Sequence, residues 1–478
     1  MRQPTRYPAT RAAERVGAGC LAFGLALALA FGVPGGAAAQ EQPILITGAT
    51  ILTAAEAGRI EDGAVLFENG RIVAVGPASE VDAPSDALVI DGTGKYITPG
   101  IVDAHSHIAA DAINEGAVSV SSMVSIHDVI DPTDIAIYRE AAGGTTTAHV
   151  MHGSANPIGG NNAVIKHRWG ADAQGLLFQG APPTIKFALG ENPKRAGSPT
   201  LPGQEARYPA SRMGVMDVVR QAFIEASEYK AEWDTYRARV ADGDRDAIPP
   251  RRNLTMDPLV EVLEGTRYVH AHSYRADEIL QLMRVAEEFG FRIHVFQHVL
   301  EGYRVADEMA EHGAHASTFS DWWAYKMEAY EAIPHNAAIM TQRGVNVSIN
   351  SDSGEEGRHL NQEAAKTMKW GGLSEADALA TVTINPAFQL LIDDRVGSLE
   401  AGKDADIVLW ENYPLSSYAR VRTTYIDGEV VFDVDADMAM RAEIAAEKAE
   451  LREMLGEADE DDDSDNEREP GRQPGGER

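Results

Sequence analysis

The sequence of 478 residues contains a single cysteine, Cys20, which lies among the first 39 residues. Beyond that point the chain can form no disulfide, bind no metal through a thiolate and use no cysteine as a nucleophile. A metal site in this chain must therefore draw on histidine, on carboxylate or on a modified lysine.

Basic residues are also scarce: 42 Lys and Arg stand against 73 Asp and Glu, for a net charge of -31. Nucleic-acid binding needs Lys and Arg against the phosphates, so we expect no nucleic-acid partner. No apolar run after residue 39 is long enough to cross a membrane. We expect a small-molecule substrate and no membrane contact after processing, and the sequence leaves a homo-oligomer open.

The first 39 residues have the pattern of a secretory signal peptide. A basic start with Arg2 and Arg15 leads to an apolar run from Leu21 to Val33, and the small residues Ala37 to Ala39 follow. This order predicts cleavage near residue 40 and a secreted or periplasmic protein. The alternative is a retained N-terminal anchor.

The far end of the chain predicts a helix and then a tail. Residues 436–456 are rich in Ala, Glu, Lys and Met and predict a peripheral amphipathic helix. Residues 457–478 contain an acidic run from Asp459 to Asp465, which cannot bury itself and predicts a disordered tail.

Two segments far apart in the sequence predict one small β-sandwich. Residues 40–97 read as short strands, with Asn69-Gly70 between two apolar runs as a hairpin signal. A similar pattern returns in residues 393–435. We expect both chain ends to contribute to this domain.

Between these segments, residues 98–392 alternate strand-like and helix-like runs and predict an α/β fold, a (β/α)8 TIM-like barrel. The segment 193–267 is long for one connection and predicts an insertion. The expected helices cover 212–227, 277–288, 305–311 and 374–381, and the expected strands cover 145–151, 184–189, 268–272, 291–298, 315–319 and 345–350.

The most informative motif ends the first apolar run of this region, Ile97 to His107. Side chains at i and i+2 of a strand point to the same face, so His105 and His107 can hold one ion from one strand end. Neutral imidazole binds Zn, Fe, Ni and similar metals. Two histidines with this spacing are common, and the remainder of the chain must support the interpretation.

Further polar residues stand near the ends of predicted strands, where barrel enzymes carry their functional side chains. Lys186 lies in an apolar run, which is costly for a lysine unless it is paired, exposed at one end or modified. His272 and His298 end two strands, with His270 and His294 deeper on the same faces, and Asp352 follows another strand. Each residue alone is ordinary.

The whole set, in the order His, His, Lys, His, His, Asp, resembles the binuclear amidohydrolases across residues 44–432. Segments 143–147, 153–156 and 397–406 also match, and the prolidase-like and imidazolonepropionase-like members are most similar. The resemblance implies a metal-dependent hydrolase whose ligands are His105, His107, Lys186, His272, His298 and Asp352. It implies Lys186 as a carboxylysine that bridges two divalent ions, with Glu191 as the rival bridge.

The resemblance also implies a reaction. A secreted amidohydrolase of this kind cleaves an amide or other C–N bond, in a dipeptide or a cyclic amide, with a metal-activated water. Zinc is the first expectation, and Mn, Fe, Co or Ni also suit histidine and oxygen ligands. Asp352 is the expected general base. The alternatives are a mononuclear deaminase or imidazolonepropionase-like enzyme, and a barrel that binds metal or ligand without turnover.

Arg275, Tyr274 and His152 are candidates for substrate binding through a carboxylate or carbonyl group. Arg275 has a structural alternative, since it can instead pair with Asp277.

Overall fold

Strands open the described chain, helices alternate with strands through its middle, and a long helix closes it. The structure is a computed structural model that describes residues 42–195, 206–322 and 324–455, all within one unit, residues 38–478. The predicted signal peptide and acidic tail lie outside these ranges. Among the described residues, no helix combines the length and the apolarity needed to span a bilayer.

The two chain ends pair in one sheet of eight strands. Its order is β17-β16-β15-β5-β1-β2-β3, with β4 paired to β1. The junction between the chain ends is the antiparallel pair β5 and β15, in which Ile97 lies opposite Leu409. The strands are β1 (Ile44–Leu52), β2 (Arg59–Glu68), β3 (Arg71–Pro77), β4 (Leu88–Asp91), β5 (Tyr96–Pro99), β15 (Ile407–Trp410), β16 (Val421–Ile426) and β17 (Glu429–Asp433).

The predicted hairpin at Asn69-Gly70 is confirmed. It joins β2 to β3, and both residues have positive φ, 52° and 76°, as a tight hairpin turn of this sequence requires. Ile46, Phe67 and Ile97 of this sheet are fully buried in one apolar cluster. The pairing of the chain ends thus buries apolar residues of both segments in one cluster, while a division into two stacked sheets stays a prediction.

The middle of the chain supplies two further sheets. One has the order β14-β13-β12-β11-β10-β8 and the other β6-β7-β9. The strands are β6 (Ile101–Ser106), β7 (Thr145–Val150), β8 (Ile158–Asn161), β9 (Ala163–Lys166), β10 (Thr184–Ala188), β11 (Tyr268–His272), β12 (Ile293–Gln297), β13 (His315–Thr318) and β14 (Val347–Ile349). From β10 to β14 every neighbouring pair is parallel, as are β6 and β7. All these parallel strands therefore end at the same edge of their sheet.

Strands β8 and β9 were not predicted, and they run antiparallel to β10 and β7. The sequence of β8, around Gly159 and Gly160, lacks the apolar run that marks the other strands, and the apolar run of β9, Ala163 to Ile165, is short. A Cβ on Gly159 would lie 2.7 Å from His152 Nδ1, and one on Gly160 would lie 2.9 Å from His152 Cδ2. Glycine is needed here because the strand passes against the His152 ring.

Among the described residues the sheets do not close into a continuous ring of hydrogen-bonded strands. The two end strands, β6 and β14, nevertheless meet just beyond their ends, where the Asp352 N–H donates to the His105 carbonyl at 3.0 Å. This contact brings the first and the last strand of the region together at the edge that carries the predicted site.

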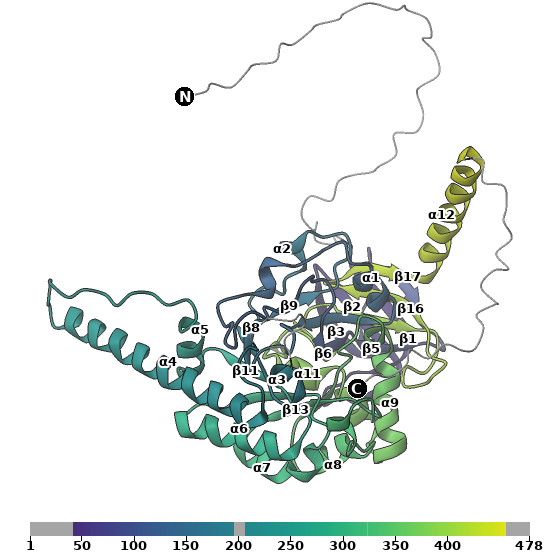
Figure 1. Ribbon diagram of the computed structural model, residues 1–478. Helices are drawn as coiled ribbons and strands as arrows, with labels where there is room; N and C mark the ends of the chain where they lie inside the picture. Colours follow the sequence, from purple (N-terminus) through teal and green to yellow (C-terminus); the bar gives the residue numbers. More distant parts are fainter. Residues whose placement is uncertain (1–41, 196–205, 323, 456–478) are drawn as a thin grey trace, which may run out of the picture. The chain divides into compact units, whose positions relative to one another are not determined.

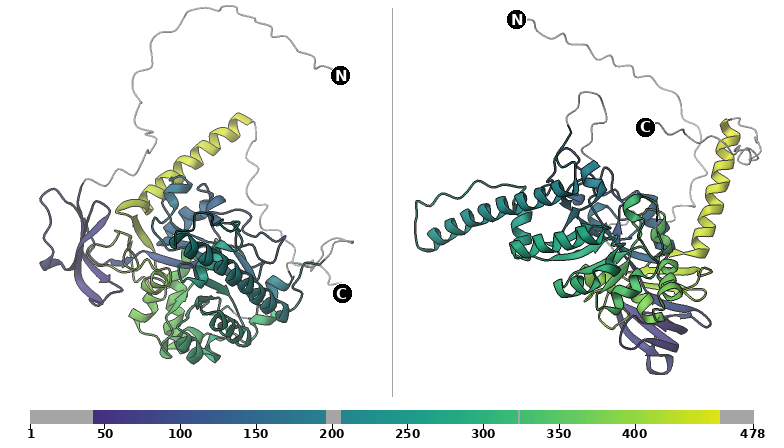
Figure 2. Two further views of the ribbon diagram at one scale, coloured as in Figure 1. Left: turned by 90° about the vertical axis from the view of Figure 1, so that its left-hand side faces the viewer. Right: turned by 60° about the horizontal axis from the view of Figure 1, so that its bottom comes forward.

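The predicted helices 277–288, 305–311, 374–381 and 436–456 correspond to α6, α7, α10 and α12, and the remaining helices apart from α4 were not predicted. Figure 1 shows α6 to α9 on the outside of the strands. The predicted helix 212–227 continues to Ala241 in α4, the long helix of Figure 2, because its apolar spacing ends near Ala226 while its helix-forming residues do not. The helices are α1 (Ile135–Ala142), α2 (Ala173–Leu176), α3 (Glu191–Arg195), α4 (Arg212–Ala241), α5 (Asp257–Leu263), α6 (Ala276–Phe289), α7 (Ala306–His312), α8 (Asn336–Gln342), α9 (Leu360–Gly371), α10 (Glu375–Ala380), α11 (Ile384–Gln389) and α12 (Val434–Leu455).

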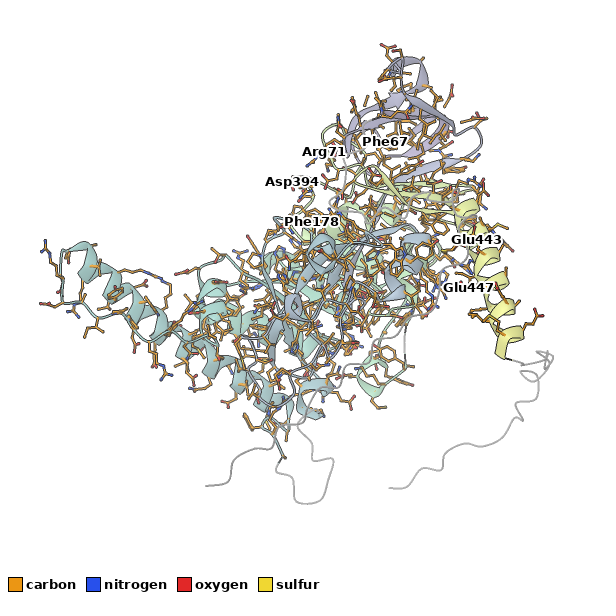
Figure 3. All side chains as sticks on the ribbon, turned by 90° about the horizontal axis from the view of Figure 1, so that it is seen from above. Phe67, Arg71, Phe178, Asp394, Glu443 and Glu447 are labelled. Atoms are coloured by element: carbon orange, nitrogen blue, oxygen red, sulfur yellow. The ribbon has the colours of Figure 1, made fainter. Side chains whose placement is uncertain are left out.

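The last helix carries a polar surface. Glu443 and Glu447 on α12 are both exposed, and Figure 3 labels them. At its start, Asp437 accepts a hydrogen bond from the Tyr138 hydroxyl of α1 at 3.0 Å. The helix is therefore tied to α1 at its first turn.

A buried ion cluster fastens β9 to the sheet of the chain ends. The Lys166 side chain has no exposed surface, and its Nζ lies 2.7 Å from Asp404, 3.0 Å from Asp406 and 2.6 Å from Asp427. Burial alone lowers the pKa of Lys166, but the three carboxylates outweigh this and the net shift is upward. Lys166 therefore stays charged and neutralises carboxylates that β15 and the β16–β17 turn bring inside.

Replacing Lys166 tests its contribution to the free energy of unfolding. We expect Lys166→Met to lower the free energy of unfolding by about 3–5 kcal/mol, because it leaves the buried Asp406 carboxylate without a cation. Denaturant titration measures the change. The matched control is Lys230→Met, which removes a lysine from a more exposed pair with Asp234 and should cost less than about 1 kcal/mol. Equal losses in the two variants would contradict the assignment.

Candidate metal centre

The predicted ligands come together at the ends of the parallel strands. His105 is the last residue but one of β6, His272 is the last residue of β11, and His298 directly follows β12. Lys186 stands in the middle of β10, and Asp352 lies just after β14. Because parallel strands end at one edge of a sheet, residues from distant parts of the sequence meet there.

Three donor groups form the tightest cluster among the described residues. One ligand atom from each of His105, His107 and Asp352 lies within 4.8 Å of the other two. The His107 Nε2 is 3.0 Å from Asp352 Oδ1, and the His105 Nε2 is 3.3 Å from the His107 Nε2. The two histidines do lie on one side of the strand end, as their spacing predicts.

Lys186 and His298 extend this cluster. The Lys186 Nζ lies 3.1 Å from His105 Nε2, and the His298 Nε2 lies 3.6 Å from Asp352 Oδ2. The His105 and His298 rings are 4.3 Å apart between centroids. The lysine and the carboxylate therefore face the same group of imidazoles.

His272 lies beside His298, with 5.0 Å between ring centroids. Within the described chain, both ring nitrogens of His272 and the Nδ1 of His298 are buried without a hydrogen-bond partner. Orphaned buried nitrogens are costly, and a bound ion is one of the groups that satisfies them. The donor set fits one or two divalent cations.

Two of these residues have unusual backbone conformations. His298 has φ of 52° and Asp352 has φ of 46°, values that residues other than glycine adopt only rarely. Such strain is retained where the surroundings impose it, and it is frequent at functional sites. His298 directly follows β12, Asp352 follows β14 after two intervening residues, and both side chains face the cluster.

Burial decides the charge states of the cluster. It lowers the pKa of His105 and His272 well below the usual range and that of His298 to about 3, so these imidazoles are neutral and have lone pairs free for a cation. It also lowers the pKa of Lys186 to about 7. Burial raises the pKa of Asp352, but His298, His107 and Lys186 outweigh it, and the carboxyl group stays ionised.

Gln297 supports the first ligand and was missed in the sequence. Its Oε1 lies 3.3 Å from His105 Nδ1, and its Nε2 lies 3.1 Å from His270 Nδ1 and 3.3 Å from the Ala104 carbonyl. His105 then donates through Nδ1 and presents the Nε2 lone pair to the cluster. No sequence signal distinguishes this amide from an ordinary polar residue next to His298.

The other histidine of the pair is oriented by the backbone. The His107 Nδ1 lies 2.9 Å from the Met151 carbonyl, which only accepts, so Nδ1 carries the proton and Nε2 faces Asp352. Beneath both histidines, buried Asp103 accepts from the N–H groups of His105 and Ser351. The strand ends of β6 and β14 are thus held in register by one carboxyl group.

The three predicted substrate-binding residues differ in the contacts they make. Arg275 forms a two-pronged pair with Asp277, at 2.9 and 3.0 Å, which is the structural alternative expected from the sequence. The His152 Nε2 accepts from the Glu115 N–H at 3.1 Å, and its Nδ1 donates to the Gly153 carbonyl at 2.8 Å, so both ring nitrogens are engaged. Tyr274 is buried, with its ring 4.7 Å from that of His272.

Glu191, the rival bridge, is the first residue of α3, and its N–H donates to Glu328 Oε2 at 2.8 Å. It is not among the residues that form the tight donor group. Lys186 contacts that group directly, through His105.

Comparisons with known proteins agree with this geometry. A profile of the Amidohydrolase family matches residues 96–431. Amidohydrolase tasK of Hapsidospora irregularis is 32% identical over 403 residues, which are 78% of this chain and 40% of that protein. An imidazolonepropionase of Geobacillus sp. (strain WCH70) is 25% identical over 391 residues, covering 74% of this chain and 84% of that protein.

A solved structure shows the same relation. The crystal structure of an amidohydrolase from Thermotoga maritima MSB8 superposes with a TM-score of 0.74 and 32% identity, covering 82% of this chain and 100% of that one. The chain belongs to the amidohydrolase family, with the mixed α/β, TIM-barrel-like fold of that family. The resemblance seen in the sequence is confirmed.

The role of Gln297 has a measurable consequence. We expect Gln297→Leu to weaken divalent-metal binding about 10- to 100-fold, because His105 loses the acceptor that sets its tautomer. Competition with a chelator of known affinity measures this. Gln221→Leu, on the exposed face of α4, should leave affinity unchanged. Unaltered affinity in Gln297→Leu would show that the amide does not position the ligand.

Proposed function

We propose that this protein is a secreted, metal-dependent amidohydrolase that cleaves an amide or other C–N bond with a metal-activated water. One observation carries the proposal: a lysine, a carboxylate and four imidazoles from the ends of several parallel strands converge on one point. Purely structural packing has no need for this set, because three of its buried nitrogens are left without a partner among the described residues.

The proposed ligands are His105, His107, Lys186, His272, His298 and Asp352, around two divalent cations, with zinc first and Mn, Fe, Co or Ni as alternatives. Lys186 is the proposed bridge, as a carboxylysine. A neutral amine reacts with carbon dioxide, and the buried Lys186 lies 3.1 Å from a ligand nitrogen, where a carbamate would replace an expensive ammonium by an anion between cations.

A bound divalent cation supplies a water of pKa near 7 and polarises the substrate carbonyl group. The chain then contributes the proton transfer. Asp352 remains ionised, its side chain is partly exposed, and it faces both His107 and His298. It is placed to accept a proton from the attacking water and to pass it to the departing nitrogen.

The proposal includes features that rest on the sequence. Export follows from the pattern of residues 1–39, and the closed (β/α)8 barrel corresponds to residues 98–392, with both chain ends forming a small β-sandwich domain. The second candidate function is a mononuclear, imidazolonepropionase-like or deaminase-like reaction, which the relative of Geobacillus favours.

Replacing the proposed base separates catalysis from metal binding. We expect Asp352→Asn to keep most of the metal and to lose at least about 100-fold in kcat, because an amide cannot accept the proton. Hydrolysis of a panel of amides, dipeptides and cyclic amides, with metal analysis of the same samples, tests this. Full activity in Asp352→Asn would rule out the assigned base.

Metal content identifies the bridge and the number of ions. We expect about two metals per chain in protein purified without chelator. Lys186→Ala should lower this number, and Glu191→Ala should retain it. The opposite pattern would make Glu191 the bridge. A single metal that neither change removes would favour the mononuclear alternative.

A further inference from the structure

Lys326, the residue just before the 3₁₀ helix η4 (Met327–Ala329), places a cation beside the proposed metal ligands. The Lys326 Nζ lies 4.2 Å above the centroid of the Tyr274 ring. That ring is in turn 4.7 Å from the ring of His272 and 5.9 Å from that of His298. Lys326 is therefore one aromatic ring away from two proposed ligands.

The charge of Lys326 acts on the His272 and His298 imidazoles. Apart from burial, the groups that most depress the pKa of His272 and His298 include Lys186 and Lys326. Lys186 is fully buried among the ligands, whereas the Lys326 side chain keeps 23% of its surface exposed. Of these two cations, only Lys326 is accessible to a molecule that enters from solvent.

The position of Lys326 is held by buried groups. Its Nζ donates a hydrogen bond to Asn192 Oδ1 at 3.2 Å and forms an ion pair with Glu328 Oε1 at 3.1 Å. Glu328 is buried and also accepts from Arg212 at 3.0 Å. An ammonium has three donor hydrogens, and the hydrogen bond to Asn192 uses one of them, so donor capacity remains for a ligand.

A hydroxyl group stands next to this ammonium. Tyr325 is hydrogen-bonded to Tyr274, and its own side chain is 49% exposed. Lys326 also lies 5.8 Å from the centroid of the Tyr325 ring. Lys326 and Tyr325 thus offer one positive charge and one neutral hydrogen-bond donor beside the cluster.

We propose that Lys326, assisted by the Tyr325 hydroxyl, binds a carboxylate of the substrate and so makes the enzyme specific for acyl amides of amino acids, such as N-acyl amino acids and dipeptides with a free C-terminal carboxylate. This rests on the proposed function. Arg275 and His152, the sequence candidates for that role, are engaged by Asp277 and by the backbone.

The donor set favours a carboxylate over other anions. One ammonium hydrogen and one hydroxyl match a single charge on two oxygens, and a doubly charged phosphate would need further cations. Among the described residues, Glu328 pairs with one further cation, Arg212. Its guanidinium group is already shared between Glu278 and Glu328. A neutral cyclic amide would leave Lys326 without a new partner.

The test uses the full-length, metal-loaded protein and a panel of N-acetyl-L-amino acids and X-Pro dipeptides, each beside its C-terminal carboxamide. We expect wild type to favour the acid at least tenfold in kcat/KM. Lys326→Met should raise KM for the acids about 10- to 100-fold, the worth of one charge-assisted hydrogen bond, with little change in kcat. The carboxamides and the metal content should not change.

Two further variants sharpen the result. Lys326→Arg retains the charge and should keep most of the preference for acids. Lys369→Met removes a lysine that also lies over an aromatic ring, 4.8 Å from Trp370 on exposed α9, and should behave as wild type. Calorimetric binding of the same acids to metal-loaded Asp352→Asn, with and without Lys326→Met, gives a readout independent of turnover.

The outcomes separate the two proposals. Hydrolysis with equal kcat/KM for acids and carboxamides, or equal losses for both in Lys326→Met, overturns the role of Lys326 and leaves the amidohydrolase function in place. Cleavage of neutral cyclic amides alone does the same. Failure of wild type to hydrolyse any C–N bond in the panel or in cyclic amides overturns the proposed function and the inference together.

Discussion

The buried amine of Lys186 is the constraint on which this site depends. It has no exposed surface, lies 3.1 Å from a neutral imidazole, and has its pKa lowered to about 7 by burial. A group in this position must lose its charge or gain partners of opposite charge. The proposed carbamate between cations would resolve this problem, and the same cations would satisfy the buried nitrogens of His272 and His298 that have no hydrogen-bond partner among the described residues.

The fold brings these donors together at one edge of the parallel strands. His298 and Asp352 adopt positive φ just beyond β12 and β14, and their side chains face each other. Gln297 and the Met151 carbonyl then settle which ring nitrogen of each β6 histidine is free. At the mouth, the carboxylate of Glu328 holds Lys326 and the start of α3 in place. Buried Asp103 thus supports the proposed ligand cluster, and buried Glu328 supports the proposed carboxylate site.

Much of the architecture was predictable because apolar runs mark buried strands. The strands that end near His272 and Asp352 carry such runs, and they were found. Strand β8 was missed because glycine at 159 and 160 serves a close approach to His152, and close approach leaves no periodic signal in the sequence. Strand β9 was missed because its apolar run, Ala163 to Ile165, is short. The pairing of Arg275 with Asp277 was one of two readings, since a local ion pair and a ligand-binding arginine have the same sequence pattern.

The sequence by itself determined the types of donor available, the order of the ligands along the chain and their membership of the amidohydrolase family, because these depend on residue identity and on spacing within single strands. Only the tertiary structure decided that Gln297 orients His105, that His152 is already engaged and that Lys326 lies beside the metal cluster. These contacts join residues from different strand ends and loops, and their distances depend on how parallel strands pack side by side, which spacing along one chain does not encode.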